Sequence, residues 1–353
     1  MTTSAKNYRL SDLAKPEVVK TILQDILAEF YPDHTKVTDI SLTTHKRHFK
    51  DTALSRIVIG CTITCSDKKP LELIIAAAED GTREEAFANT QLLYQHGFDR
   101  GNLLVTRPLV YLAGPQAMVY ETAMGKPLYQ FLKQQPAFDD LLQPLNLAAS
   151  WLKKLHQLEL TPDEAKIIRG YNWDRVVGLI KPYINIFAEE SAKQSEKLKK
   201  ILQRLIAYHQ DLSGPVQPRL VYGDYHPENI IISSLQAKEI IGIDFTDLTY
   251  GDPYRDLGTF IQQLDFMSQR FLPREEINKL KKHFLRSYFD RRFSELPLAY
   301  IQRINLYQAL TALRTAVWLF KLTGRRQVSL ECLNDAWLIT EKMERQEKSV
   351  NLR

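Results

Sequence analysis

Two segments of the sequence place carboxylate, amide and imidazole side chains between apolar runs. The first is VYGDYHPENIII over residues 221–232, and the second is IGIDFTDLTYGDPYRDLG over residues 241–258. Asp224, Asn229 and Asp244 offer hard oxygen ligands of the kind that Mg²⁺ binds together with water and substrate phosphates. The set is neither His-rich nor Cys-rich, which argues against zinc. Phosphoryl transfer needs such a metal site and a carboxylate that orients the attacking hydroxyl, so these residues favour that chemistry.

Turns are the simpler alternative for both segments, because Asp and Asn are common in turns without any catalytic role. A turn does not require that a GDPYRD motif follow the first carboxylate and amide at this spacing. The joint pattern therefore favours a metal site over a pair of turns.

Hydrophobic periodicity predicts a small mixed region followed by a larger helical one. A helix at 16–31 comes first, and a second helix at 82–96 is inserted between the third and fourth strands. The expected strands lie at 37–45, 54–65, 71–79, 102–112 and 116–122. Later in the chain helical periodicity dominates, interrupted by the two segments above, which read as short strands. The sequence thus predicts an α+β protein with a lobe at 1–122, containing a five-stranded antiparallel sheet, and a mainly helical lobe at 123–353.

Composition narrows the class of protein. With 353 residues, 44% of them hydrophobic, the chain can bury an extensive core. Its 47 basic and 42 acidic residues leave a mild, mixed charge of +5 that gives no support for a nucleic-acid partner. No apolar run approaches the roughly 20 residues that span a bilayer. The N-terminus lacks a signal-peptide pattern, so we expect a cytoplasmic protein with no membrane partner and with Cys61, Cys65 and Cys332 as buried, reduced thiols.

The two motifs together resemble those of the aminoglycoside phosphotransferase and choline kinase family, within the protein-kinase-like superfamily. The family string H-G-D-x-H-x-x-N corresponds to YGDYHPEN, in which Tyr222 replaces the usual His, and I-D-F and G-D-P-x-x-D-L follow it. The resemblance also includes REEAFANTQLLYQHGF and AMVYETAMGKPLYQFL, and it covers roughly residues 40–330. It implies a two-lobed protein-kinase-like fold. The long separation of Glu121 from Asp224 leaves room for the extra helices that small-molecule kinases of this family have.

The resemblance implies a role for each matching residue of the proposed site. Asp224 would be the catalytic base, and Asn229 and Asp244 would bind Mg²⁺. The backbone of Glu121 and Ala123 would hold the adenine of ATP, and GTP stays open as an alternative donor because this recognition uses the backbone.

Other matching residues would support the site. Asp256 and Asp252 would brace the catalytic loop, and His226 would support its geometry or contact phosphate. Glu85, or its neighbour Glu84, matches the helix glutamate that pairs with a phosphate-binding lysine. Acidic residues in the first turn of a helix also stabilise it without any function.

The third strand departs from the family pattern because it contains no lysine. It reads LELIIAAAED, with Ala76, Ala77 and Ala78 where the phosphate-binding lysine belongs. The preceding connection, within residues 46–56, reads as a loop that has no glycine but carries several cations. We hypothesise that side chains of this loop supply the missing charge, the alternative being a solvated loop with no such role. The candidates are Arg47, Lys50 and Arg56.

The sequence therefore predicts an ATP-dependent kinase that phosphorylates a hydroxyl group of a small molecule. The alternative is a pseudokinase, or nucleotide-binding regulatory protein, with weak or no transfer. The missing lysine favours this alternative, and the intact set of Asp and Asn side chains opposes it. For a cationic acceptor, Asp247, Tyr250 and Trp173 are candidates for an acidic or aromatic wall, although aromatic residues more often serve in packing.

Overall fold

The computed structural model describes residues 8–33, 37–50, 53–66, 68–134, 137–212, 216–321 and 325–345. The chain forms two compact units. The first unit consists of Met1–Gly125 and Glu239–Asp247, and the second of Lys126–Lys238 and Leu248–Arg353. The predicted division at residue 122 falls close to the end of the first segment. Sequence reasoning did not anticipate that the segment carrying Asp244 belongs to the first unit.

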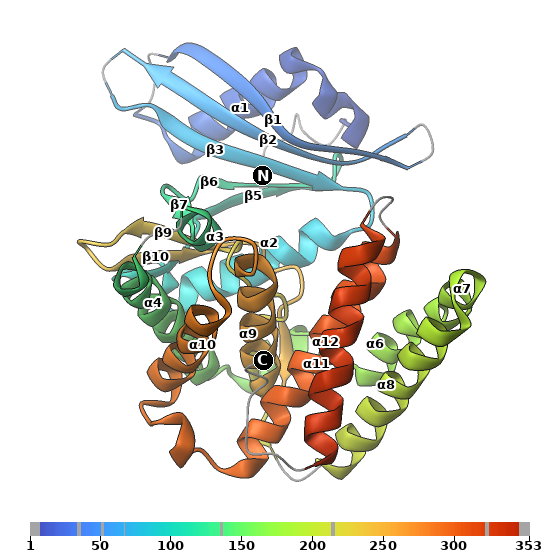
Figure 1. Cartoon of the computed structure of the whole chain (residues 1–353). Coiled ribbons are helices and arrows are strands. Elements are labelled where there is room, and N and C mark those ends of the chain that lie inside the picture. The colour runs from blue at the N-terminus through green and yellow to red at the C-terminus, as the bar shows by residue number, and fades with distance from the viewer. Residues whose placement is uncertain are drawn as a thin grey trace. The chain divides into compact units, whose positions relative to one another are not determined.

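A five-stranded antiparallel sheet dominates the first unit, as predicted (Figure 1). Its order is β1-β2-β3-β6-β5, and every neighbouring pair is antiparallel. The strands are β1 (Val37–Lys50), β2 (Ala53–Cys65), β3 (Leu71–Ala78), β6 (Ala117–Glu121) and β5 (Pro108–Leu112). The α+β prediction is therefore confirmed, with β3 at the centre of the sheet.

The connection between the first two strands is shorter than predicted. Residues 46–50 continue β1, and the pairing of Arg47 with Ile57 and of His48 with Arg56 extends the ladder beyond the apolar part of both strands. The prediction of a loop carrying these cations is therefore wrong. A strand whose side chains are polar on both faces lacks the alternation that marks a half-buried strand, yet its backbone groups still pair.

The segment expected as one strand at 102–112 forms two. β4 (Leu103–Val105) pairs in parallel with β10 (Glu239–Gly242), whereas β5 joins the antiparallel sheet. The break falls just before Pro108, which has no N–H to donate to a ladder.

Helices cover both faces of the five-stranded sheet (Figure 1). On one face, the turn η2 (Leu10–Ala14) precedes α1 (Pro16–Phe30), which buries Ile22 and Ile26 in one cluster with Ile57 and Ile75 of the sheet. The other face is covered by α2 (Thr82–Leu93), which leads into η3 (Tyr94–Phe98). A smaller buried cluster there joins Ala86 of α2 to Ala76 and Met118 of the sheet.

The second unit is mainly helical, as predicted, with two short two-stranded pairings (Figure 1). β7 (Lys126–Pro127) pairs with β9 (Ile230–Ser234), and β8 (Arg219–Val221) pairs with β11 (Thr249–Gly251). Its helical elements are α3 (Leu128–Lys133), α4 (Phe138–Gln157), α5 (Pro162–Ile167), α6 (Trp173–Ile180), α7 (Tyr183–Glu190), α8 (Ala192–Asp211), α9 (Tyr254–Ser268), α10 (Arg274–Phe289), η4 (Phe293–Glu295), α11 (Leu298–Lys321) and α12 (Arg326–Glu344).

Helix α9 is the centre of this unit and packs closely on α11. Most of its residues are buried, and the last glycine of the GDPYRDLG motif, Gly258, lies in the contact. A Cβ at Gly258 would come within 2.6 Å of the backbone of Ile304 and Gln308 on α11. Only glycine permits this approach of the two backbones, so part of the motif serves packing rather than chemistry.

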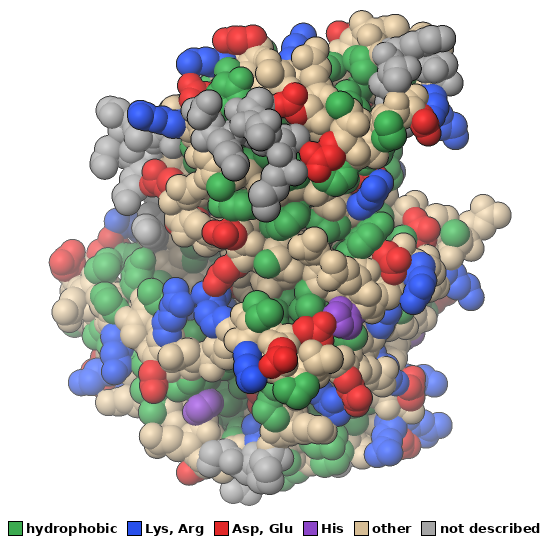
Figure 2. Space-filling model, turned by 180° about the vertical axis from the view of Figure 1, so that it is seen from behind, with side chains coloured by type: hydrophobic (Ala, Val, Ile, Leu, Met, Phe, Trp, Pro, Cys, Tyr) green, Lys and Arg blue, Asp and Glu red, His purple; other side chains and the backbone are tan. Residues whose placement is uncertain are grey.

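The mixed charge of the surface and the burial of the cysteines agree with what the composition predicted. Figure 2 shows basic and acidic side chains interspersed over the face it presents. Cys61, Cys65 and Cys332 are buried, as predicted, and form no disulfide within the described part of the chain. Over the part of the chain that the structure describes, no helix combines the length and the apolar character that crossing a membrane requires.

Candidate active site

The segment 222–229 is a loop of the second unit that connects β8 to β9. The chain turns at Gly223, whose φ of 88° lies in the left-handed region that favours glycine. Asp224 follows at once, with its side chain 50% exposed between the buried residues Gly223 and Tyr225. The turn thus presents one carboxylate to solvent from an otherwise buried backbone.

Asp256, at the start of α9, holds the backbone of this turn. Its carboxylate is fully buried and accepts hydrogen bonds from the N–H groups of Tyr222, at 2.7 Å, and Gly223, at 2.8 Å. His156 of α4 lies 2.9 Å from the same carboxylate. A buried carboxylate with three such partners is well satisfied, and it fixes the turn that precedes Asp224. Its contribution to catalysis stays a prediction.

Arg255 holds the same turn from its other side. Its guanidinium donates to the Gly223 carbonyl at 3.1 Å and to the Thr249 hydroxyl at 3.1 Å. The guanidinium also lies over the ring of Tyr171, 4.5 Å from the ring centroid. Since both backbone groups of Gly223 are bonded to side chains of α9, the turn has little freedom to move.

Aromatic rings form the bed beneath the loop. Tyr222 is fully buried and packs edge-on against Trp151 of α4, with ring centroids 5.6 Å apart. Tyr225 stacks on Trp151, with ring centroids 5.9 Å apart. Its hydroxyl group donates a hydrogen bond to the Ala148 carbonyl at 2.7 Å. Tyr222 therefore serves in packing at the position where the family string has His.

His226 keeps Asp224 ionised. Its Nδ1 accepts from the Glu228 N–H at 3.3 Å, so the proton of the neutral ring is on Nε2, which lies 3.4 Å from Asp224 Oδ2. Desolvation alone would raise the pKa of Asp224. The hydrogen bond from His226, together with the charges of Arg314 and Arg255, nevertheless holds that pKa below its ordinary value. Asp224 is thus a carboxylate at neutral pH.

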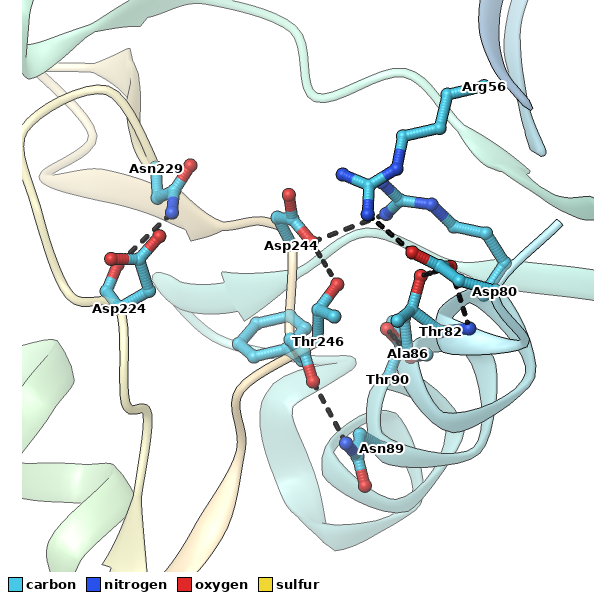
Figure 3. Close-up of polar contacts among 12 residues, drawn as sticks. Arg56, Asp80, Thr82, Ala86, Asn89, Thr90, Asp224, Asn229, Asp244 and Thr246 are labelled. Atoms are coloured by element: carbon cyan, nitrogen blue, oxygen red, sulfur yellow. Dashed lines mark hydrogen bonds and ion pairs between the residues drawn. The ribbon is translucent and has the colours of Figure 1, made fainter. Parts of the chain in front are cut away.

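Asn229 is oriented by the loop itself. Its Nδ2 donates to the main-chain carbonyl of Asp224 at 3.1 Å, and its own N–H donates to the His226 carbonyl at 3.0 Å. Figure 3 shows that the amide oxygen of Asn229 points away from Asp224. An amide whose nitrogen is bonded to its own loop keeps that oxygen available as a metal ligand.

Asp244 lies in the first unit, two residues after the end of β10. Its φ of 61° is left-handed, which is strained for a residue with a side chain and is typical of functional positions. Its Oδ1 accepts from the Thr246 hydroxyl at 2.5 Å and lies 3.4 Å from Nη1 of Arg83. Asn89 of α2 donates to the next carbonyl, that of Phe245, at 2.9 Å, so α2 and this segment are held together (Figure 3).

Glu121 is the last residue of β6, and Ala123 lies two residues beyond it. The Glu121 side chain accepts from the Tyr31 hydroxyl at 2.5 Å and from Arg107 at 3.3 Å, which fixes the strand end. Desolvation and the hydrogen bond to Glu121 raise the pKa of Tyr31, so it remains a donor. Ala123 is half-buried just beyond the strand. The adenine-binding role of their backbone stays a prediction.

The three alanines where the resemblance places a lysine, Ala76, Ala77 and Ala78, are all buried. Ala76 is 2% exposed and packs in one cluster with Ala86 of α2 and Met118 of β6. Ala86 therefore faces the strand, whereas Glu84 and Glu85 lie on the exposed part of α2. The structure thus shows an apolar contact between strand and helix, and pairing of Glu85 with a phosphate-bound cation stays a prediction.

The three predicted cations have different surroundings. Arg56 pairs with Asp80, and that carboxylate also accepts from the N–H and hydroxyl of Thr82 (Figure 3). The guanidinium of Arg47 lies 5.1 Å from the centroid of the exposed ring of Phe49. Lys50 ends β1, but its side chain lies outside the described residues. Their role toward a nucleotide stays a prediction.

Comparison with known proteins identifies the family. The family model described as a phosphotransferase enzyme family matches residues 68–296, well over half of the sequence. The chain belongs to this phosphotransferase family. Membership supports phosphotransferase activity toward small molecules and does not favour the pseudokinase alternative. No curated protein matches the chain significantly.

Solved structures confirm the fold of the phosphotransferase. The Plasmodium vivax ethanolamine kinase has a TM-score of 0.61 at 15% identity, covering 91% of this chain and 89% of that one. Choline kinase from Cryptosporidium parvum has a TM-score of 0.62 at 11% identity, with 93% and 97% covered. The GDP complex of aminoglycoside 2'-phosphotransferase-IIIa has a TM-score of 0.58 at 15% identity, with 90% and 98% covered. At these identities the similarity shows the fold, which is the predicted two-lobed kinase-like one.

The acceptor candidates of the phosphotransferase lie in different surroundings. Trp173, at the start of α6, is 9% exposed and stacks on His209 of α8 with ring centroids 3.9 Å apart. Both rings line a recess of about 360 Å³ between α6 and α8. Tyr250 is half-buried on β11, where its backbone pairs with Arg169 and Tyr171, and Asp247 is half-buried in the first unit. Their acceptor role stays a prediction.

Asp252 is held by another helix of the second unit. Its carboxylate caps α9 by accepting from the Tyr254 N–H at 2.9 Å, and it pairs with Arg303 of α11 at 2.9 Å. Desolvation raises the pKa of Asp252 despite the charge of Arg303. These contacts anchor the start of α9, the helix whose side chains hold the 222–229 loop.

Asn229 and Asp244 carry oxygen atoms of the kind that Mg²⁺ binds, and their role as its ligands stays a prediction. Among the residues that the structure describes, no three or more His, Cys, Asp or Glu side chains gather as a metal site. Mg²⁺ commonly takes one or two protein oxygens and completes its shell with water and phosphate. The carboxylate of Asp244 and the amide oxygen of Asn229 are of that type.

Sequence reasoning missed three residues of this machinery. Trp151 forms the bed of the loop, Arg255 holds its carbonyl, and Arg83 contacts Asp244. Arg255 could have been found, because it lies inside the GDPYRDLG motif next to Asp256. Arg83 had no such signal, because its meaning depends on the proximity of α2 to a segment far along the chain.

Proposed function

We propose that this phosphotransferase transfers the γ-phosphoryl group of ATP, or of GTP, to a hydroxyl group of a small molecule. The observation that carries the proposal is Asp224, an ionised and half-exposed carboxylate on a loop whose backbone is fixed by the buried Asp256. A carboxylate so placed can accept a hydrogen bond from a hydroxyl and take its proton as the phosphorus–oxygen bond forms.

The other residues complete the assignment. Asn229 and Asp244 are the proposed ligands of Mg²⁺, which supplies neutralising charge to the β- and γ-phosphates when bound with the nucleotide. Asn229 is oriented for this by its bond to the Asp224 carbonyl. The backbone of Glu121 and Ala123 receives the base. His226 keeps Asp224 ionised and in place.

The acceptor is a small molecule with a free hydroxyl. Choline, ethanolamine and kanamycin are the first compounds to test, because they appear in the names of structurally similar proteins. Trp173, Tyr250 and Asp247 are the proposed aromatic and acidic contacts for a cationic acceptor of this kind.

The test combines binding and turnover. The thermal midpoint of the protein is measured with ATP, GTP and ADP, with and without Mg²⁺, and phosphate transfer is then followed with a panel of amino alcohols, aminoglycosides and sugars. Asp224→Asn should bind nucleotide as the wild type does but transfer phosphate about 10²- to 10⁴-fold more slowly. If the wild type shows no nucleotide shift and no transfer to any acceptor, the proposed function is wrong.

A further inference from the structure

The first unit holds a cation beside Asp244 that the sequence pattern did not indicate. Arg83, in the first turn of α2, has a side chain only 15% exposed, and its Nη1 lies 3.4 Å from Asp244 Oδ1. Its Nε is buried, and within the described part of the chain it has no hydrogen-bond partner. A buried guanidinium N–H without a partner is costly in a folded protein, so the protein alone does not satisfy all the donors of Arg83, and a turn of the guanidinium would offer them to a ligand.

The position of Arg83 is fixed by its helix. Arg83, Ala86 and Asn89 are spaced three residues apart and therefore share one face of α2. Asn89 donates to the Phe245 carbonyl at 2.9 Å, and Thr246 donates to Asp244 at 2.5 Å, so the face and the 244–246 segment are held together. The guanidinium thus stays next to the carboxylate that is the proposed metal ligand.

The same face shows why the cation comes from the helix and not from the strand. One turn after Arg83, Ala86 packs in one buried cluster with Ala76 and Met118, and Ala76 is one of the three alanines where the family pattern has the lysine. Tyr120 is a neighbour of this cluster, and burial raises its pKa to about 12, with the charge of Asp244 raising it and that of Arg83 lowering it. The charged pair and the apolar cluster are therefore adjacent parts of one surface.

We propose that Arg83 binds the phosphates of the nucleotide and supplies the charge that the missing lysine would otherwise provide. The inference rests on the proposed function of the chain as a nucleotide-dependent phosphotransferase. A guanidinium offers several donors in a planar fork that matches phosphate oxygens, and its low exposure makes each charge-assisted bond stronger than in water. If the Asp244 carboxylate binds a divalent cation, its attraction for Arg83 is weaker. The Arg83 guanidinium would then be available to bind phosphate.

The predicted cations fit this role less well. Arg56 already has a carboxylate partner in Asp80, so its charge is neutralised locally. The guanidinium of Arg47 lies near the exposed ring of Phe49 on β1. Arg83 differs from Arg56 because its carboxylate partner, Asp244, is itself a proposed metal ligand.

The test separates contact with phosphate from support of the metal. Binding of ADP and of adenosine is measured by calorimetry for the wild type and Arg83→Gln, each in EDTA and in Mg²⁺. We expect Arg83→Gln to weaken ADP binding about 10- to 100-fold in both conditions, the loss of one charge-assisted interaction, while adenosine binding is unchanged. Arg83→Lys should lie between the two proteins because it keeps the charge and loses the fork.

Matched variants and contrary outcomes complete the design. Arg100→Gln removes the same charge from an 84% exposed arginine of the same unit and should leave ADP binding unchanged. A loss confined to Mg²⁺ would mean that Arg83 only positions Asp244, and an effect of Arg56→Gln without one of Arg83→Gln would assign the role to Arg56; either result overturns the proposal. If Arg83→Gln does not fold, Arg83→Met replaces it, and a wild-type ADP affinity for that uncharged variant overturns the proposal. A wild type that binds no nucleotide overturns the proposed function as well.

Discussion

The loop at 222–229, which carries the proposed catalytic base, and the strand–helix face of the first unit differ in how closely they match the family pattern. Hydrogen bonds fix the backbone of the loop. Asp256 accepts from two of its N–H groups, and Arg255 donates to one of its carbonyls. The face formed by β3 and α2 has no lysine where the family pattern expects one, and Ala76, Ala86 and Met118 form a buried apolar cluster there.

The difference follows from what each region must provide. Orientation of a hydroxyl depends on one carboxylate within a fraction of an ångström, so the loop has to keep its residues and their supports. Neutralising the charge of a phosphate depends on a cation at a suitable distance, and that cation can come from another point of the backbone. Helix α2, which packs on β3, offers such a position at Arg83.

The largest expected effect is that of breaking the support of the loop. In Asp256→Asn, the N–H of Tyr222 or of Gly223 would face the NH₂ group of the new side chain instead of a carboxylate oxygen. His156 would also lose the carboxylate beside it. We expect the substitution to lower the free energy of unfolding by about 3–5 kcal/mol. The midpoint of urea denaturation measures this loss. Asp163→Asn, at a 91% exposed position, is the control and should change the midpoint little. An equally small change for Asp256→Asn would show that the loop does not depend on this carboxylate.

A smaller effect is expected from restoring the lysine at the face. Ala76→Lys forces a long charged side chain into a filled apolar cluster, so we expect a loss of about 1–3 kcal/mol from overpacking, or more if the charge stays buried. Denaturation and ADP calorimetry measure the outcome, with Ala88→Lys, at an exposed position of α2, as the control. If Ala76→Lys is as stable as the wild type and binds ADP more tightly, the place of the lysine is open and the comparison between the two regions fails.

The smallest expected effect concerns pH. The pKa of Asp224 is held below its ordinary value, so the stability that its charge contributes is present above that ordinary value and is lost as the pH falls through the lowered one. His226→Ala removes the hydrogen bond that opposes desolvation, and the acidic limb of the kcat/KM profile should move to higher pH. The exposed His48 on β1 provides the control, His48→Ala. An unmoved limb would mean that His226 does not set the ionisation of Asp224.

The long periodic elements of this protein were predictable because their patterns are local. The helix over 16–31 and the strands at 54–65 and 71–79 carry their apolar residues at the period of one element, and the structure has α1, β2 and β3 there. The extension of β1 through Arg47 was not predictable, since its polar residues pair only because β2 lies alongside. The division of 102–112 into β4 and β5 likewise depends on two different partner strands.

By itself the sequence determined which residues we propose for the chemistry of the loop, because Asp224, Asn229 and their neighbours lie within one short segment and their spacing matches the family motif. Only the tertiary structure decided what supports that chemistry. The hydrogen bonds from Tyr222 and Gly223 to Asp256, and the contact of Arg83 with Asp244, join residues far apart in the chain. Such contacts are set by the packing of helices and strands, and no local pattern records them.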